Sequence, residues 1–263
     1  MTSRTGSFRR HDEELELRKQ ALVDEAVAGR AGAAEIEPFL TRYFLHVAAE
    51  DILSWPAVEL YEVACGHREF ARLRPPGAAK VRVVTFSPDE LAGRPAHTLV
   101  EIVTDDMPFL VDSVTQEFSR RDIAIDLVVH PQFVVRRDLD GQLLEVLGTL
   151  DAHEAPKNAL VESWMHFEVE RQSGPEAEAA LRRDVVRVLR DVHDAVEDWQ
   201  RMKAIAQQVA DQLAAVPPSG VEASETAEAT EFMRWLADDY FTFLGYREYR
   251  LFDDTETAEP ALG

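Results

Sequence analysis

Two adjacent carboxylates, Asp105 and Asp106, stand where a β-prone stretch gives way to a helical pattern. A helix N-terminus offers free amide hydrogens and the positive end of a dipole, which suit a carboxylate ligand. The acidic pair beside it could meet an amino group, so the junction predicts an amino-acid clamp. The residues expected to contact such an effector are Asp105, Asp106, Met107, Phe109, Asp112 and Ser113.

The same loop has a purely structural interpretation. In that interpretation, the carboxylate of Asp106 accepts the free amide hydrogens of the first helical turn, as N-cap residues do. Pro108 then fixes the first turn, because its backbone angle suits that position. Both interpretations place a helix start here, and only the first gives the loop a ligand.

Residues for other kinds of chemistry are sparse. The twelve glycines never form Gly-x-Gly, so the sequence carries neither a dinucleotide fingerprint nor a P-loop. No histidine pair has metal-ligand spacing, and Cys65, the only cysteine, cannot make a zinc site alone. His130 and His166 are expected to be ordinary sheet histidines. We therefore predict no catalytic, cofactor-binding or metal-binding residue in this chain.

The charge balance narrows the classes of partner. The chain of 263 residues carries a formal net charge of -21, which repels nucleic acid and anionic lipid. No apolar run reaches the roughly 18 residues that a membrane helix needs. We therefore expect no nucleic-acid partner and no membrane partner. A single cysteine fits a reducing cytoplasm.

Residues 1–77 are expected to form a helical region. Apolar residues recur at helical spacing through three stretches, and the sequence Pro75–Gly77 closes the region. The predicted helices span residues 11–30, 35–49 and 56–73.

From Lys80 onward the apolar residues alternate with polar ones, which indicates strands. One strand at 80–85 precedes a β-α-β-β-β-α series between residues 98 and 196. Its second strand is long, from Ile123 to Arg137, and parity places its apolar residues on one face. Residues 78–200 therefore predict an α+β domain. We expect a ferredoxin-like antiparallel sheet with helices on one face, preceded and followed by helical segments.

Beyond this domain, residues 201–220 extend the last helix to a Pro-rich stop. Residues 221–263 predict a linker, a short helix and the first strand of a following unit, at Phe241–Leu251. Because no partner strands follow that strand, we expect the sequence to be a truncated part of a longer protein.

Three groups of residues, taken in order, resemble the N-terminal region of the large bacterial NAD-specific glutamate dehydrogenases. The first is Asp106–Val114, with the sequence Asp-Met-Pro-Phe-Leu-Val-Asp-Ser-Val, followed by Ile123–Pro131 and its Val-Val-His-Pro ending. The second, Glu162–Glu168, is similar to a later strand of that family. The third, Asp239–Tyr249, resembles the most distinctive motif of the family.

The resemblance implies features that the residue patterns alone do not. Members of the family carry ACT-type domains in the N-terminal segment and the catalytic domain far downstream. The implied parent enzyme uses NAD to deaminate L-glutamate oxidatively to 2-oxoglutarate and ammonia, while this segment is not catalytic alone and holds no cofactor. The implied role is regulation and oligomerisation in the cytoplasm. Its partners would be the rest of the parent polypeptide, further copies in a homo-oligomer, and an amino-acid effector.

One departure from the family pattern concerns Phe109. ACT domains that bind amino acids often place glycine after the proline of this loop, so that the backbone can approach the ligand. A phenylalanine ring there would fill space that the ligand needs, or pack into the core. Two alternatives therefore stay open beside the regulatory segment. One is an amino-acid-sensing ACT module that binds a small effector at residues 104–113, and the other is a purely structural assembly module.

Overall fold

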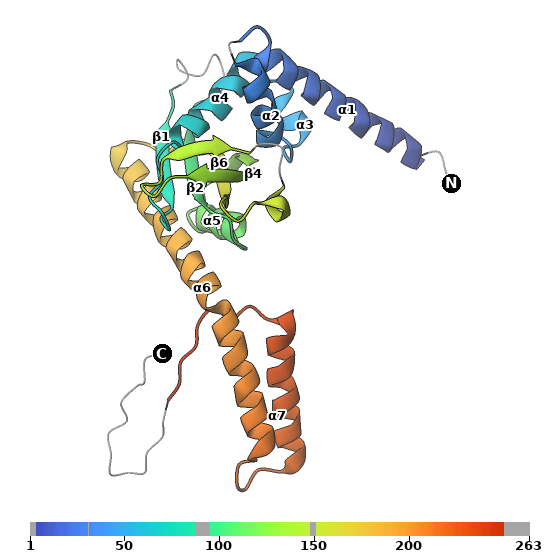
Figure 1. The fold of residues 1–263 in the computed structure, drawn as a ribbon, viewed down its shortest axis with the longest axis vertical. Helices are drawn as coiled ribbons and strands as arrows, with labels where there is room; N and C mark the ends of the chain where they lie inside the picture. The colour runs from blue at the N-terminus through green and yellow to red at the C-terminus, as the bar shows by residue number, and fades with distance from the viewer. Residues whose placement is uncertain (1–3, 31, 88–94, 148–150, 250–263) are drawn as a thin grey trace. The chain divides into compact units, whose positions relative to one another are not determined.

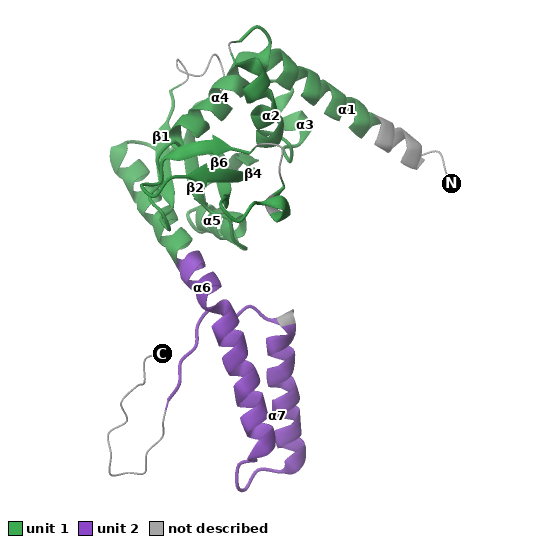
Figure 2. Cartoon of the chain, viewed as in Figure 1, with its two compact units in different colours: residues 1–190 green, residues 191–263 purple. Residues whose placement is uncertain are grey.

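The computed structural model describes residues 4–30, 32–87, 95–147 and 151–249. The chain divides into two compact units, residues 1–190 and residues 191–263 (Figure 2). The first unit contains an antiparallel sheet and the helices that cover it, and the second is largely helical (Figure 1). The domain bounds expected after residues 77 and 200 stay predictions.

The helices that precede the sheet are α1 (Arg4–Val27), α2 (Ala33–Tyr43), α3 (Ala49–Ile52) and α4 (Ala57–Phe70). The helix expected at 35–49 therefore ends at Tyr43, and a second helix, α3, begins at Ala49. A turn after α2 separates them, and it buries the side chains of Phe44 and Val47 although neither belongs to a helix. Burial of these two residues explains why the apolar pattern continues through the turn.

The strands are β1 (Lys80–Thr85), β2 (His97–Asp105), β3 (Ile125–Val129), β4 (Gln132–Arg137), β5 (Leu143–Val146) and β6 (Leu160–Glu170). β6 lies at the centre, with β2 along one edge and both β3 and β4 along the other. β1 extends the sheet beside β2, and β5 extends it beside β4. Every pair is antiparallel, so the predicted α+β class is confirmed.

The long strand expected at 123–137 is interrupted after Val129. Pro131 lies in the gap and has no backbone N–H to donate, but its carbonyl accepts a hydrogen bond from the amide of Trp164 at 3.0 Å. The register against β6 is the same before and after the gap. β3 and β4 are thus two halves of one strand. As parity predicts, one face of it contributes Leu127, Val129, Phe133 and Val135 to a common core.

Helix α5 (Leu110–Arg120) and the part of α6 (Pro175–Ala215) that belongs to the first unit lie on one side of the sheet, as expected for a ferredoxin-like sandwich (Figure 1). The rings of Phe118 and Phe167 meet there, edge to face, with centroids 5.2 Å apart. The N-terminal part of α6 buries Leu181 completely. This side of the unit is therefore an ordinary apolar helix-on-sheet layer.

The N-terminal helices cover the opposite side of the sheet. The ring of Phe39 in α2 stacks on that of Phe133 in β4, with centroids 5.1 Å apart, and also contacts Trp164 of β6. One core cluster joins residues of α1, α2 and α4 to residues of β2, β3, β4 and β6. The sheet face that a two-layer sandwich leaves to solvent is consequently buried here.

The second unit contains the rest of α6, α7 (Ala223–Trp235) and the π-helical turn η3 (Leu236–Tyr240). A short 3-10 turn, η2 (Ala152–Glu154), belongs to the first unit. Of the strand expected at Phe241–Leu251, residues 241–249 form no strand apart from a bridge at Glu248, and residues 250 and 251 lie outside the described part.

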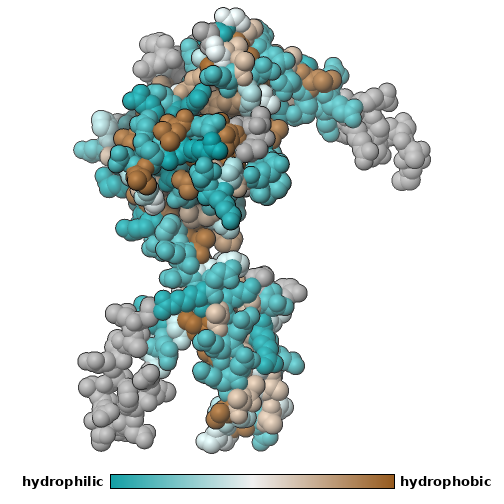
Figure 3. All heavy atoms as spheres, viewed as in Figure 1, coloured by the Kyte–Doolittle hydropathy of each residue, from teal (hydrophilic) through white to brown (hydrophobic). Residues whose placement is uncertain are grey.

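The surface agrees with the acidic composition. Hydrophilic residues cover much of the visible face of each unit (Figure 3). Among the described residues, no helix combines the length and the apolar character that a bilayer-spanning helix requires.

Candidate functional site

The predicted effector loop connects β2 to α5. Asp105 is the last residue of β2 and Leu110 the first of α5, so residues 106–109 form the connection. The half-buried members of the predicted set are Asp105, Asp106, Met107 and Ser113, while Phe109 and Asp112 are exposed. The structure thus brings all of them onto one strand–loop–helix segment. Effector binding by this segment stays a prediction.

Asp106 does not cap α5, and the prediction that it does so is wrong. Its carboxylate accepts two hydrogen bonds from the side-chain amide of Gln132, at 2.9 and 3.0 Å, and one from the hydroxyl of Ser163 at 2.5 Å. These donors belong to β4 and β6. Phe109 occupies the N-cap position of α5 instead, without a side-chain cap hydrogen bond.

Phe109 adopts a left-handed backbone conformation, with φ 71°. This region costs a residue with a side chain roughly 1–2 kcal/mol and favours glycine. The side chain is 48% exposed, so the ring does not pack into the core. The strained backbone therefore presents an aromatic ring to solvent at the start of α5.

Asp105 belongs to a buried ionic network. Arg74 donates to Asp105 at 2.5 Å and, through Nε, to Oε1 of Glu162 at 2.9 Å. Arg137 donates to both oxygens of Glu162 at 2.6 and 2.8 Å, and the indole of Trp164 donates to Oε2 at 3.0 Å. Burial alone would raise the pKa of Glu162, but these donors outweigh it and lower that pKa. The carboxylate of Asp105 is therefore already hydrogen-bonded to Arg74 within the chain.

A second polar cluster lies between the N-terminal helices and the sheet. Its members His67 of α4, Glu101 of β2 and His166 of β6 are all buried. Glu101 and His166 are direct partners in the register of β2 and β6. His67 Nδ1 shares a hydrogen bond of 2.9 Å with the hydroxyl of Tyr43, and Arg82 Nε donates to Oε2 of Glu101 at 2.6 Å.

Burial and charge shift the titration of these groups in different directions. Burial lowers the pKa of His67 to about 4. Burial would raise the pKa of Glu101, but His166, His67 and Arg82 outweigh it and lower that pKa to about 2. Burial would also lower the pKa of His166, but the carboxylates of Glu101 and Glu168 outweigh burial and raise it. The imidazole of His166 therefore lies against two buried carboxylates, those of Glu101 and Glu168.

The sequence alone does not predict this cluster. His166 looks like an ordinary sheet histidine, and its partners stand far away in the sequence. One signal is present in the sequence: polar residues alternate with apolar ones in β6, at His166 and Glu168, and Glu101 stands alone among the apolar residues of β2. Only the pairing of β2 with β6 shows that these polar positions meet.

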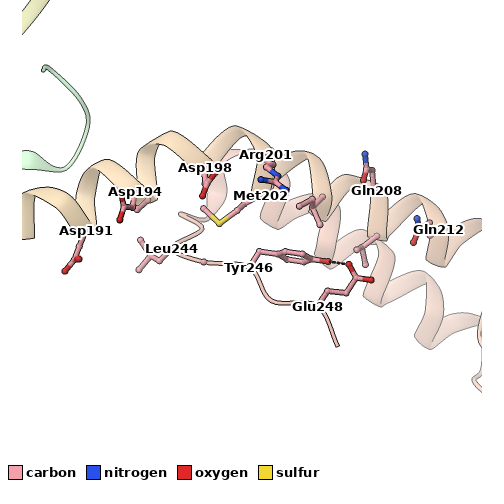
Figure 4. Close-up of a pocket in the computed structure, with 14 residues that line it drawn as sticks. Asp191, Asp194, Asp198, Arg201, Met202, Gln208, Gln212, Leu244, Tyr246 and Glu248 are labelled. Atoms are coloured by element: carbon pink, nitrogen blue, oxygen red, sulfur yellow. Dashed lines mark hydrogen bonds between the residues drawn. The ribbon is translucent and has the colours of Figure 1, made fainter. Parts of the chain in front are cut away.

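The second unit contains an open cavity of about 790 Å³ between α6 and residues 244–248 (Figure 4). Tyr246 donates from its hydroxyl to Oε2 of Glu248 at 3.2 Å on its wall. No predicted effector residue lines it. Its charged lining residues are Asp191, Asp194, Asp198, Arg201 and Glu248. The acidic excess disfavours a ligand with a free carboxylate.

Residues 39–185 match the model of the family described as the glutamate dehydrogenase ACT1 domain. The chain is 34% identical to the NAD-specific glutamate dehydrogenase of Halomonas elongata over 84% of its own length and 14% of that protein. It is 33% identical to the enzyme of the same name from Pseudomonas aeruginosa, over 67% of this chain and 11% of that protein. The corresponding Mycobacterium tuberculosis protein is 29% identical over 80% of this chain and 13% of its own length. The chain thus spans a small fraction of the length of these relatives.

Proposed function

The chain belongs to the glutamate dehydrogenase ACT1 domain family, and we propose that it is a regulatory and oligomerisation segment of an NAD-specific glutamate dehydrogenase. The observation that carries the proposal is the match over residues 39–185. These residues include the end of α2, helices α3 to α5, the whole sheet and the start of α6. The matched region is therefore a complete α+β layer structure rather than a single motif.

The proposed parent reaction converts L-glutamate, NAD and water to 2-oxoglutarate, ammonia and NADH. Relatives that carry the name NAD-specific glutamate dehydrogenase support this assignment. The chain corresponds to 14% or less of their length in the first two comparisons, so we assign NAD binding and catalysis to other parts of the parent polypeptide. The single cysteine is consistent with a cytoplasmic protein.

The contacts within the effector loop favour assembly over direct effector binding. Asp105 is engaged by Arg74, and Asp106 by Gln132 and Ser163. An incoming ammonium group would have to displace these donors, each of which forms a charge-assisted hydrogen bond. The acidic pair therefore supports a structural role in holding β2, β4 and β6 together.

The edges of the sheet support self-association. In the order β1-β2-β6-β4-β5, the outermost strands are β1 and β5, and an edge strand offers backbone groups to another strand. Both faces of the sheet are already covered by helices of the same chain. We therefore propose the edges, rather than a face, as the contact between copies of the segment or with the rest of the parent polypeptide.

Two measurements on the 263-residue chain test this function. Light scattering during size-exclusion chromatography is expected to show a dimer or larger species that depends on protein concentration. A strictly monomeric chain at high concentration would contradict self-association. An assay of glutamate-dependent NAD reduction is expected to show no turnover, and appreciable turnover would contradict the non-catalytic role.

The alternative function is an amino-acid sensor at residues 104–113. The observation in its favour is the N-terminus of α5, which has no side-chain cap at Phe109. Calorimetry with aspartate, glutamate and arginine distinguishes the two functions. Heat of binding from any of them, abolished by Asp112→Lys, would favour the sensor. No heat on the folded chain would exclude these amino acids and favour assembly.

A further inference from the structure

We propose that His67, Glu101 and His166 form a binding site for one divalent transition-metal ion of the zinc type. The proposal does not depend on the proposed function, because it rests on contacts inside the first unit. One ligand atom from each of the three residues lies within 4.8 Å of the other two. The three residues come from α4, β2 and β6, and all are less than 2% exposed.

His166 supplies the observation that points to a ligand. Its side chain is 2% exposed, and neither ring nitrogen has a hydrogen-bond partner. Nδ1 lies 3.9 Å from Oε1 of Glu101, and Nε2 lies 3.6 Å from Oε1 of Glu168, and both distances exceed a hydrogen bond. The two carboxylates lie within ion-pair range of the ring, but a buried nitrogen that forms no hydrogen bond is costly, and a metal ion between His166 and Glu101 would remove that cost.

The surroundings of the other two residues suit metal ligands. Oε2 of Glu101 accepts from Arg82, so this contact fixes the carboxylate while Oε1 faces His166. His67 Nδ1 is hydrogen-bonded to the hydroxyl of Tyr43 at 2.9 Å, and Nε2 lies 3.3 Å from the carbonyl oxygen of Ile102, a contact that a metal ion bound at Nε2 would replace. Histidine ligands in metal sites characteristically use the second ring nitrogen for such a bond, which fixes the orientation of the ring. These contacts hold two of the three ligands in place before a metal binds.

The ligand types select the class of ion. Two imidazoles and one carboxylate are typical zinc ligands, whereas calcium and magnesium prefer oxygen ligands alone. An ion bound here would connect α4 to the two strands at the centre of the sheet. It would therefore stabilise the attachment of the N-terminal helices to the sheet, as structural zinc ions stabilise the folds that hold them.

The structure also provides a matched control. Asp151, His153 and Glu154 form a second group of potential ligands, and all three are exposed. This group offers one imidazole, while the buried cluster offers two. The number of imidazole ligands therefore distinguishes the two places without any mutation.

The experiment measures zinc binding by the full 263-residue chain. The chain, freed of any affinity tag, is stripped with a chelator, refolded with and without zinc sulfate, and dialysed. Metal content is then measured by mass spectrometry, and X-ray absorption reports the ligands. We expect one zinc ion per chain, two imidazole ligands and a higher melting temperature with zinc. His153→Gln should bind zinc like the unmodified chain, and His166→Gln and Glu101→Gln should lose it.

Each outcome bears on the proposal. A folded chain without bound zinc after both treatments would overturn it. So would a spectrum with a single imidazole ligand, or zinc retained by His166→Gln and lost by His153→Gln. If the His166 variant does not fold, as circular dichroism would show, the ligand count of the unmodified chain still decides the question.

Discussion

The guanidinium of Arg74 donates from Nε to Oε1 of Glu162 at 2.9 Å, and both side chains are at most 1% exposed. Arg74 follows α4, and Glu162 lies in the central strand β6. The pair therefore joins the N-terminal helical region to the middle of the sheet. Arg137 contacts the same carboxylate, so the negative charge of Glu162 is shared between two guanidinium groups.

Replacing Glu162 with Gln should destabilise the chain strongly. Arg74 and Arg137 would lose the carboxylate that both contact, and breaking a buried ion pair from one side typically costs about 3–5 kcal/mol. We expect a decrease of that order in the free energy of unfolding, measured by urea denaturation. The control is Glu145→Gln, which removes an exposed pair with Arg136 and should cost less than about 1 kcal/mol. Equal effects of the two substitutions would contradict the importance of the buried network.

The effect of Glu162→Gln should depend on pH. The pKa of Glu162 is lowered in the folded chain from its ordinary value of 4.5. The carboxylate therefore contributes stability above pH 4.5, and this contribution is lost as the pH falls through the folded-state pKa. We expect the stability difference between the unmodified chain and the variant to be constant near neutrality and to narrow below pH 4.5. Denaturation curves from pH 7 to pH 3 check this, and a difference that widens in acid would contradict it.

Gly141 permits close contact between two backbone segments. A Cβ atom at this position would lie 2.0 Å from the carbonyl oxygen of Arg74, and φ is 84°. Gly141→Ala should therefore force the segments apart and weaken the hydrogen bond from Arg74 N to Gly141 O, now 3.0 Å. Gly77→Ala is the matched control, since φ is 69° and no atom lies near the added Cβ. We expect the control to cost about 1–2 kcal/mol and Gly141→Ala at least about 2 kcal/mol more.

The strain at Phe109 can be measured by comparing glycine with alanine. The free energy of unfolding of Phe109→Gly should exceed that of Phe109→Ala by roughly 1 kcal/mol. Relief of the left-handed strain should outweigh the extra conformational entropy that glycine gives to the unfolded chain. Asp112 is the control, since it is exposed inside α5. At this position Asp112→Ala should be more stable than Asp112→Gly by about 1 kcal/mol. Thermal denaturation of the four variants tests the reversal of sign, and the same sign at both positions would show that Phe109 is not strained.

The alternation of residues in the strands was sufficient to predict the sheet. Leu127, Val129 and Phe133 share one face because side chains alternate along a strand, and this holds across the gap at Pro131. Helix bounds were less predictable. Phe44 and Val47 continue the apolar spacing of α2, yet they lie in the turn that follows it. Tertiary packing buries them there, although they belong to no helix.

The site was predicted less completely than the fold, for a physical reason. Polar residues that alternate with apolar ones, as in β6, are typical of a sheet face in contact with water. Here the N-terminal helices bury that face, so Glu101 and His166 meet in the interior instead. The capping interpretation of Asp106 rests on its neighbours in sequence, because a helical pattern follows it. Its actual donors, Gln132 and Ser163, come from strands whose position the local sequence does not encode.

The central position of β6 has a consequence for the order in which the chain can fold during synthesis. Among the strands of this sheet, β6 is the last to leave the ribosome, yet it is the partner of β2, β3 and β4. Until it emerges, the nascent chain can form only the β1–β2 and β4–β5 hairpins of the final sheet. At a translation rate of roughly 5–20 residues per second, the edge of β2 that pairs with β6 then stays unpaired for several seconds. Nascent chains of this protein should therefore depend on chaperones that shield β2 during that interval.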